Sequence, residues 1–148
     1  MLISDFLQLS DVLIDMQASD KASLLHDLGS RAAKIIGMDP AIVVAALDNR
    51  EQIGSTGVGD GVAIPHARFQ NLEKPFGLFV RLKKAIDFDA IDEKRVDLIF
   101  LLLLPADQKS QQLNALASVA HTLRNQEIQT RLRQASDVAA LHHIVTSG

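Results

Sequence analysis

The 148-residue sequence lacks cysteine, tryptophan and tyrosine, and phenylalanine, with six residues, is the one large aromatic type present. Without cysteine, the chain has no disulfide bond, no thiolate metal site and no cysteine nucleophile. Because aromatic side chains are so few, the core must be mainly aliphatic. The longest apolar run, Leu98 to Leu104, is much shorter than the roughly 20 residues that span a bilayer. The first residues also lack the basic-then-apolar pattern of a signal peptide.

A concentrated positive charge is absent as well. The formal net charge is −3, and the 15 lysines and arginines are scattered along the chain instead of forming a basic stripe, so we expect no nucleic-acid partner. A hydrophobic share of 47% and a charged share of 22% are ordinary for a folded soluble protein. We therefore expect residues 1–148 to form one domain of a cytoplasmic protein that is not embedded in a membrane.

The first half of the chain carries clear helix signals. Residues 12–14 predict a short strand. Ser19-Asp20 offers an N-cap for a helix whose apolar residues recur at helical spacing up to Gly37. Asp39-Pro40 predicts the start of a second helix, since aspartate caps and proline suits the first turn, and this helix should run to about Arg50.

The second half alternates strand and helix patterns. We predict a strand over 76–82, an acidic connection over 86–92 and a central strand, apolar on both faces, over 96–104. Helical patterns follow, with one apolar face at Leu113, Leu116, Ala117, Ala120 and Leu123, another at Ile128, Leu132 and Ala135, and a last helix after Ser136-Asp137. Strands interleaved with helices indicate an α/β fold, a single-domain three-layer sandwich in which helices flank a mixed β-sheet.

The most distinctive segment is 54–66, in which four of the eight glycines lie between 54 and 61. Clustered glycines predict a shaped turn whose N–H groups can approach a ligand closely. A short apolar strand should follow and end at Pro65, which lacks a ladder donor. His66 would then lie at a strand end beside a loop suited to an anion.

Nucleotide and metal sites fit this segment poorly. A phosphate-binding P-loop needs lysine after its second glycine, but Asp60 occupies that position. The dinucleotide fingerprint has a different glycine spacing and opens a helix instead of a strand. The remaining histidines, His26, His121, His142 and His143, have no metal-ligand spacing. We expect them to be ordinary surface or partly buried residues, and we expect no metal and no cofactor.

His66 is the residue whose surroundings suggest chemistry. A neutral imidazole near pH 7 is a good nucleophile and can accept a phosphoryl group. The hydroxyls of Ser55 and Thr56 are candidate donors to the phosphoryl oxygens, and Arg50 or Arg68 could supply positive charge. Two alternatives stay open on these residues alone. His66 could be an ordinary histidine beside a turn, or it could be the base of a serine-type triad with Ser55 and Asp87, although no nucleophile-elbow motif is present.

Two segments make the sequence similar to a known family: 50–57, Arg-Glu-Gln-Ile-Gly-Ser-Thr-Gly, and 61–66, Gly-Val-Ala-Ile-Pro-His. With the downstream segments 86–92, 96–100 and 105–108, they resemble the enzyme IIA components of the bacterial phosphoenolpyruvate-dependent phosphotransferase system (PTS). The class is the mannitol/fructose-like one, and the chain looks most like its nitrogen-regulatory members. The similarity extends from about Leu9 to about Thr146.

This resemblance implies a phosphoryl carrier and regulator. His66 would accept a phosphoryl group on Nε2 from an HPr-like phosphocarrier protein, and its phosphorylation state would select regulatory protein targets. Family members commonly carry a second histidine where this chain has Gln112. A glutamine amide can hydrogen-bond a phosphoryl oxygen or His66 but cannot become cationic. Two other functions stay open: a binding regulator that works without phosphorylation, and a sugar-specific IIA component that serves a separate transporter.

Overall fold

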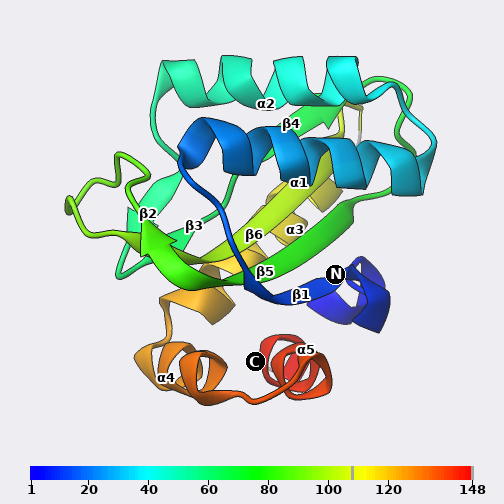
Figure 1. The fold of residues 1–148 in the computed structure, drawn as a ribbon. Coiled ribbons are helices and arrows are strands. Elements are labelled where there is room, and N and C mark those ends of the chain that lie inside the picture. Colours follow the sequence, from blue (N-terminus) through cyan, green and yellow to red (C-terminus); the bar gives the residue numbers. More distant parts are fainter. Residues whose placement is uncertain (108, 148) are drawn as a thin grey trace.

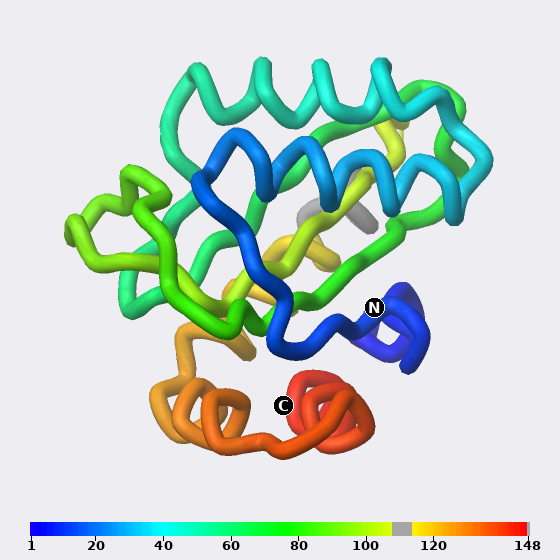
Figure 2. The backbone as a smooth tube through the Cα atoms, in the orientation of Figure 1, coloured from blue at the N-terminus to red at the C-terminus, as the bar shows by residue number. Residues whose placement is uncertain are grey.

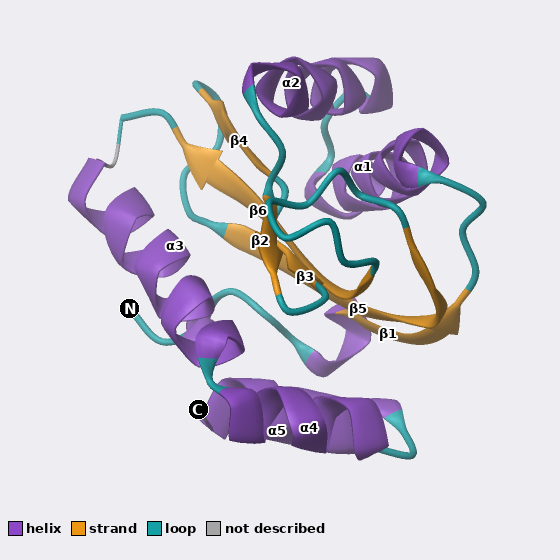
Figure 3. Cartoon of the chain, turned by 90° about the vertical axis from the view of Figure 1, so that its left-hand side faces the viewer, coloured by secondary structure: helices purple, strands orange, loops and turns teal. Residues whose placement is uncertain are grey.

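The computed structural model describes residues 1–107 and 109–147, with the side chains of residues 109–113 outside the described part. A mixed sheet lies between two layers of helices (Figures 1 and 3). Helices α1 (Lys21–Ile36) and α2 (Pro40–Ile53) cover one face. Helices α3 (Lys109–Arg124), α4 (Gln126–Gln134) and α5 (Val138–Ser147) cover the other. The predicted α/β three-layer sandwich is confirmed.

The first two helices begin at the residues that the sequence indicates. Asp20 caps α1 by accepting a hydrogen bond from the Ser23 N–H at 2.8 Å, and Gly37 ends the helix in the left-handed region at φ 77°. Asp39 caps α2 by accepting from the Ala41 N–H at 3.0 Å, directly before Pro40. The second helix continues to Ile53, beyond the predicted end at Arg50, so the helix reaches the edge of the glycine-rich segment.

The sheet has six strands, and its main path runs β1-β5-β6-β3-β2, with β4 also paired to β6. Strand β5 is antiparallel to β6, β2 is antiparallel to β3, and the remaining pairs are parallel. The strand bounds are β1 (Val12–Met16), β2 (Gly57–Gly59), β3 (Val62–Ala63), β4 (His66–Phe69), β5 (Phe76–Ile86) and β6 (Val96–Pro105). The strand predicted over 76–82 is longer than expected, and no separate strand was expected after His66.

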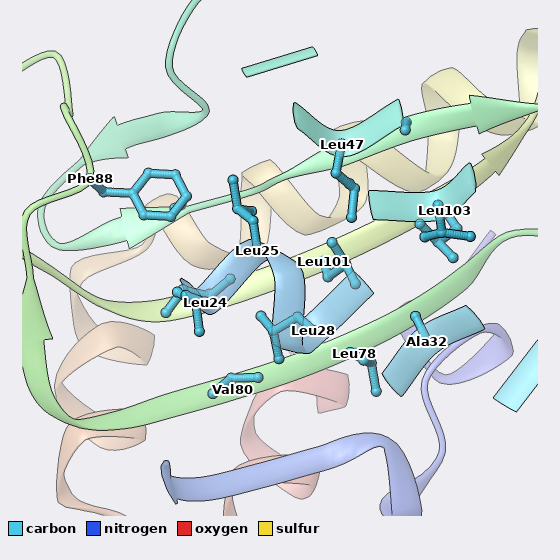
Figure 4. Close-up of a cluster of buried hydrophobic side chains, with 14 of the residues drawn as sticks. Leu24, Leu25, Leu28, Ala32, Leu47, Leu78, Val80, Phe88, Leu101 and Leu103 are labelled. Carbon is cyan, nitrogen blue, oxygen red and sulfur yellow. The ribbon is translucent and has the colours of Figure 1, made fainter. Parts of the chain in front are cut away.

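Strand β6 divides two hydrophobic cores, as its uniformly apolar sequence predicts. Ile99, Leu101 and Leu103 belong to the core beneath α1 and α2, where Figure 4 shows Leu101 and Leu103 among leucines of both helices. Leu98, Phe100 and Leu102 belong to the core beneath α3, α4 and α5. Because successive side chains of a strand point to opposite faces, an apolar run of this length needs cover on both sides.

The predicted apolar face of α3 is confirmed at Leu116, Ala120 and Leu123, which contact the core, and is wrong at Ala117. The structure buries Ala115, Val119 and Leu123, whereas Ala117, assigned to the core from the sequence, is exposed. Alanines are small and fit either side of a helix, so the larger Val119 and Leu123 set the buried face. The side chain of Leu113 lies outside the described part.

Short 3-10 helices η1 (Ile3–Asp5) and η2 (Leu9–Asp11) precede β1. Figure 2 shows this N-terminal segment on the same side of the sheet as α5, near the C-terminal end. The His142 Nε2 atom of α5 lies 3.0 Å from the Leu7 carbonyl oxygen, to which it donates a hydrogen bond. In residues 1–107 and 109–147, no helix has both the length and the apolar character to span a membrane.

Candidate functional site

The glycine-rich segment folds as a β-hairpin. Strands β2 and β3 are antiparallel and meet at Asp60-Gly61, where φ is 57° and 79°. Two consecutive residues of positive φ are the mark of a type I′ turn, for which Asp-Gly is a favoured pair. We expected a loop with free N–H groups here. Instead, the chain pairs with itself, and Asp92 of the acidic connection accepts a hydrogen bond from the Asp60 N–H at 2.9 Å.

His66 opens a strand; the sequence led us to expect it at a strand end. Both β3 and β4 run parallel to β6 in the same register, so they form one line along β6, interrupted at Ile64-Pro65. Pro65 cannot donate to the ladder, but its carbonyl still accepts from the Leu102 N–H at 2.9 Å. Strand β6 therefore holds the segments on both sides of the interruption in place.

The backbone beside the interruption orients the His66 ring. The Nδ1 atom lies 2.9 Å from the Ile64 carbonyl oxygen. A carbonyl oxygen can only accept, so Nδ1 carries the hydrogen, and in the neutral ring the lone pair is on Nε2. Among the residues that the structure describes, none hydrogen-bonds Nε2. A backbone contact two residues away therefore defines which ring nitrogen keeps the lone pair.

The surroundings also favour the neutral ring. Burial is the main cause that lowers the pKa of His66 below its ordinary value, and the positive charges of Arg50 and Arg68 lower this pKa further. The hydrogen bond to Ile64 and the negative charge of Glu51 act in the opposite direction without reversing the shift. At neutral pH the imidazole is mostly uncharged, which is the form that can attack phosphorus.

His66 lies in an open depression of about 520 Å³ that α2 and β4 form together. Its lining includes Arg50 and Arg68, both anticipated from the sequence, and also Asn49, which sequence reasoning missed. Asn49 directly precedes Arg50 on α2, but no motif had singled it out. The Arg50 Nη1 atom donates to the Gly54 carbonyl at 2.8 Å, which ties the guanidinium to the end of its own helix. Two cations and an amide thus surround the nucleophile.

The hydroxyls of Ser55 and Thr56 are bonded to protein acceptors in this structure. Ser55 donates to the Phe88 carbonyl at 2.8 Å and accepts from the Gly57 N–H at 3.0 Å. Thr56 is 4% exposed, and its hydroxyl donates to Glu51. For either hydroxyl to bind a phosphoryl group, its present bond must first break, so their direct role stays a prediction.

A serine-type triad is not assembled. Ser55 donates to a backbone oxygen and His66 Nδ1 donates to Ile64, while the exposed Asp87 accepts from the Asp89 N–H at 3.0 Å. None of the three predicted triad residues bonds another in the described structure. This alternative is therefore set aside.

The last predicted site residue, Gln112, lies on the first turns of α3, and its side chain is outside the described part. His26, His121 and His143 are exposed, and His142 is partly buried against Leu7. Within residues 1–107 and 109–147, no three His, Cys, Asp or Glu side chains gather as metal ligands would.

Comparison with known proteins assigns this sequence to one family. The sequence matches the family described as "Phosphoenolpyruvate-dependent sugar phosphotransferase system, EIIA 2" over residues 5–148. The chain belongs to this family. It is thus a component of a phosphotransferase system, and the resemblance found in the sequence is confirmed.

Within the family, proteins named for nitrogen regulation are well represented among its relatives. The chain is 40% identical to a nitrogen regulatory protein of Bradyrhizobium diazoefficiens, with 97% of this chain and 94% of the relative covered. It is 40% identical to that of Escherichia coli strain K12, with 95% and 90% covered. The crystal structure of nitrogen regulatory protein IIA-Ntr from Neisseria meningitidis matches with a TM-score of 0.93 at 34% identity, covering 97% of this chain and 99% of that one.

Proposed function

We propose that the chain is a phosphoryl carrier of the nitrogen-related phosphotransferase system, with His66 as the acceptor. Family membership and the relatives' names support the system. The observation that carries the proposal is the bond from His66 Nδ1 to the Ile64 carbonyl, which leaves the lone pair on Nε2 of a residue that lines the depression. The donor is an HPr-like phosphocarrier protein, phosphorylated on a histidine of its own.

In the proposed transfer, the Nε2 lone pair attacks phosphorus as the bond between phosphorus and the donor's histidine breaks. The donor ring leaves with that electron pair. The His66 ring, which keeps its proton on Nδ1, gains positive charge as the new P–N bond forms, and the Ile64 carbonyl stabilises this charge. Arg50 and Arg68 attract the phosphoryl oxygens. The protein therefore contributes position and charge, as phosphoryl transfer requires.

The regulatory output follows from the position of His66 at the surface depression. A phosphoryl group adds about two negative charges at neutral pH. Added to a pocket that holds Arg50 and Arg68, these charges change which partner surfaces fit, without refolding the sheet. We propose that regulatory targets distinguish the two states in this way.

Incubation with phosphoenolpyruvate, enzyme I and its phosphocarrier tests the acceptor directly. We expect intact mass to rise by one acid-labile phosphoryl group in the wild type and in His26→Ala, the matched exposed-histidine control. His66→Ala should gain none. Labelling of His66→Ala, or no labelling of the wild type, contradicts the proposal.

The output is tested with the same proteins. We expect a regulatory target to bind the wild type differently before and after phosphorylation, while His66→Ala binds equally in both mixtures. Equal binding in all cases would instead favour a regulator that works without phosphorylation. Onward transfer to a cysteine of an enzyme IIB protein would favour a sugar-specific component. The E. coli mannitol IIA domain, whose complex with phosphorylated IIB has been solved, shares the fold at a TM-score of 0.81 but only 16% identity.

A further inference from the structure

A largely buried ion pair joins α1 to α2 and takes no part in the transfer step described above. The Glu51 carboxylate on α2 is 2.8 Å from the Lys21 ammonium on α1, with 6% of the Glu51 side chain and 19% of the Lys21 side chain exposed. The Lys21 ammonium also lies 4.7 Å above the centre of the Phe88 ring. A second carboxylate, that of the exposed Asp89, lies 3.8 Å from the same ammonium. A pair this deeply placed is costly to desolvate unless further bonds satisfy it.

Those further bonds lead to the site segment. Both carboxylate oxygens of Glu51 accept from the Thr56 N–H at 3.2 Å, and one of them also accepts from the Thr56 hydroxyl. The Thr56 backbone is thereby fixed, five residues beyond Glu51 and past the end of α2. Because Thr56 is buried, loss of these bonds would leave its N–H without an acceptor and away from water.

From Thr56 the hydrogen bonds continue to the nucleophile. The Thr56 carbonyl accepts from the Ile64 N–H at 3.0 Å. The Ile64 carbonyl in turn accepts from His66 Nδ1 at 2.9 Å. An unbroken series of bonds thus joins Lys21, Glu51, Thr56, Ile64 and His66, and it crosses from α1 through α2 and the hairpin to β4.

We propose that Glu51 is a positioning residue for His66, whose carboxylate anchors Thr56 and Ile64 and so sets which imidazole nitrogen is free to react. The inference rests on the proposed phosphoryl transfer at His66. Glu51 acts on His66 through Thr56 and Ile64 and does not itself touch the phosphoryl group. Its negative charge also acts on His66, in the direction opposite to Arg50 and Arg68.

Two variants separate position from charge. Glu51→Ala removes both, and we expect phosphoryl transfer to slow about 100-fold, the scale of an ångström-sized misplacement at a reacting group. Glu51→Gln keeps an acceptor oxygen for Thr56 but removes the charge, so we expect a smaller loss, about tenfold. Thr56→Val keeps the backbone N–H and loses only the hydroxyl bond, and its loss should be smaller still.

Asp97→Asn is the matched control. Asp97 forms an ion pair with Arg133 at 3.0 Å beside the hairpin turn, away from the series of bonds that ends at His66. The Asp97→Asn variant should lower the melting temperature by about as much as Glu51→Gln lowers it. The rate of phosphoryl transfer per folded molecule should stay at the wild-type value.

Two readouts report on the His66 ring itself. Nitrogen-15 NMR of the unphosphorylated protein should show Nδ1–H in the wild type and in Asp97→Asn, and a mixture of both tautomers in Glu51→Ala. Because Glu51 raises the pKa of His66 while Arg50 and Arg68 lower it, Glu51→Gln should titrate at lower pH than the wild type. In the pH profile of the phosphoryl-transfer rate, the fall in rate at low pH should also occur at lower pH in Glu51→Gln than in the wild type. A purely structural role would leave the tautomer and this pH profile unchanged.

The outcomes distinguish the two proposals. If the wild type is phosphorylated, and the Glu51 variants keep its tautomer, titration and rate, the positioning role is wrong and the acceptor role stands. If the wild type is not phosphorylated, the acceptor role is wrong, whereas the NMR readouts still decide whether Glu51 orients the ring. If Glu51→Ala does not fold, Glu51→Gln and Thr56→Val carry the same test.

Discussion

The centre of the sheet and the His66 segment are held by different forces. Strands β5 and β6 are fixed by apolar side chains buried on both faces, and each of these side chains packs against many neighbours. Segment 54–66 is short and rich in glycine. Its second half is anchored by buried Val62, Ala63 and Ile64, whereas its first half depends on polar bonds to Glu51, Phe88 and Asp92. We therefore expect substitutions in the central strands to act mainly on stability, and substitutions around the first half of the segment to act mainly on the proposed chemistry at His66. Substitutions in the two regions should separate these properties.

The largest effect on stability is expected at Phe100. Its ring is fully buried between Phe6 and Phe79, with ring centres 6.2 and 5.9 Å away. Phe100→Ala should lower the free energy of unfolding by about 4 kcal/mol, through lost burial and the cavity left behind. Urea denaturation measures this. If the folded fraction of this variant also loses phosphoryl acceptance at His66, the expected separation between stability and chemistry is wrong.

The reverse pattern is expected at Arg50. Arg50→Gln removes a cation beside His66, and we expect the phosphorylation rate to fall about tenfold while the melting temperature changes little. Arg31→Gln is the matched control, because Arg31 forms an exposed ion pair with Asp27 on α1. Single-turnover transfer from the phosphocarrier measures both. Equal rates in the two variants would show that charge at the pocket contributes nothing.

A smaller effect tests the hairpin turn. Gly61 has φ 79°, and a Cβ there would lie 2.5 Å from Arg133 Nη2. Gly61→Ala should lower the free energy of unfolding by about 2 kcal/mol, from backbone strain together with displacement of Arg133. Gly37 has φ 77°, and a Cβ there would meet no atom within 4 Å, so Gly37→Ala should cost about 1 kcal/mol from strain alone. Similar losses for both variants would show that the Arg133 contact is dispensable.

The smallest effect concerns pH. Because the pKa of His66 is lowered in the folded state, the unfolded chain binds more protons at this residue as pH falls below about 6.5. His66 therefore reduces stability progressively under acidic conditions and has no effect well above that pH. Denaturation of the wild type and His66→Gln between pH 5 and 8 should show a difference in stability that stays constant near neutral pH and changes only on the acidic side. Parallel curves would contradict the lowered pKa.

The sequence predicted the parts whose signals are local. Asp20 and Asp39 are caps that act within three residues, and the apolar run of β6 shows its two-sided burial directly. The face of α3 was predicted less well, because several alanines leave the helical pattern ambiguous and the buried face follows Val119 and Leu123.

The sequence suggested which residues come together at the candidate site, but not the contacts that hold them there. His66, Arg50 and Arg68 share one depression, as their sequence context suggested. The acceptor of the Ser55 hydroxyl is Phe88, 33 residues away, and no local pattern indicates such a partner. Strand β4 was missed because its four residues follow a proline, and only the pairing with β6 defines them as a strand.

The most direct test of the account is the nitrogen that carries the phosphoryl group. Nitrogen-15 and phosphorus-31 NMR of the labelled, phosphorylated protein identifies the bonded ring atom through its coupling to phosphorus. The bond from Nδ1 to the Ile64 carbonyl predicts phosphorus on His66 Nε2 with the proton retained on Nδ1. Phosphorus on Nδ1, or on any residue other than His66, would contradict it.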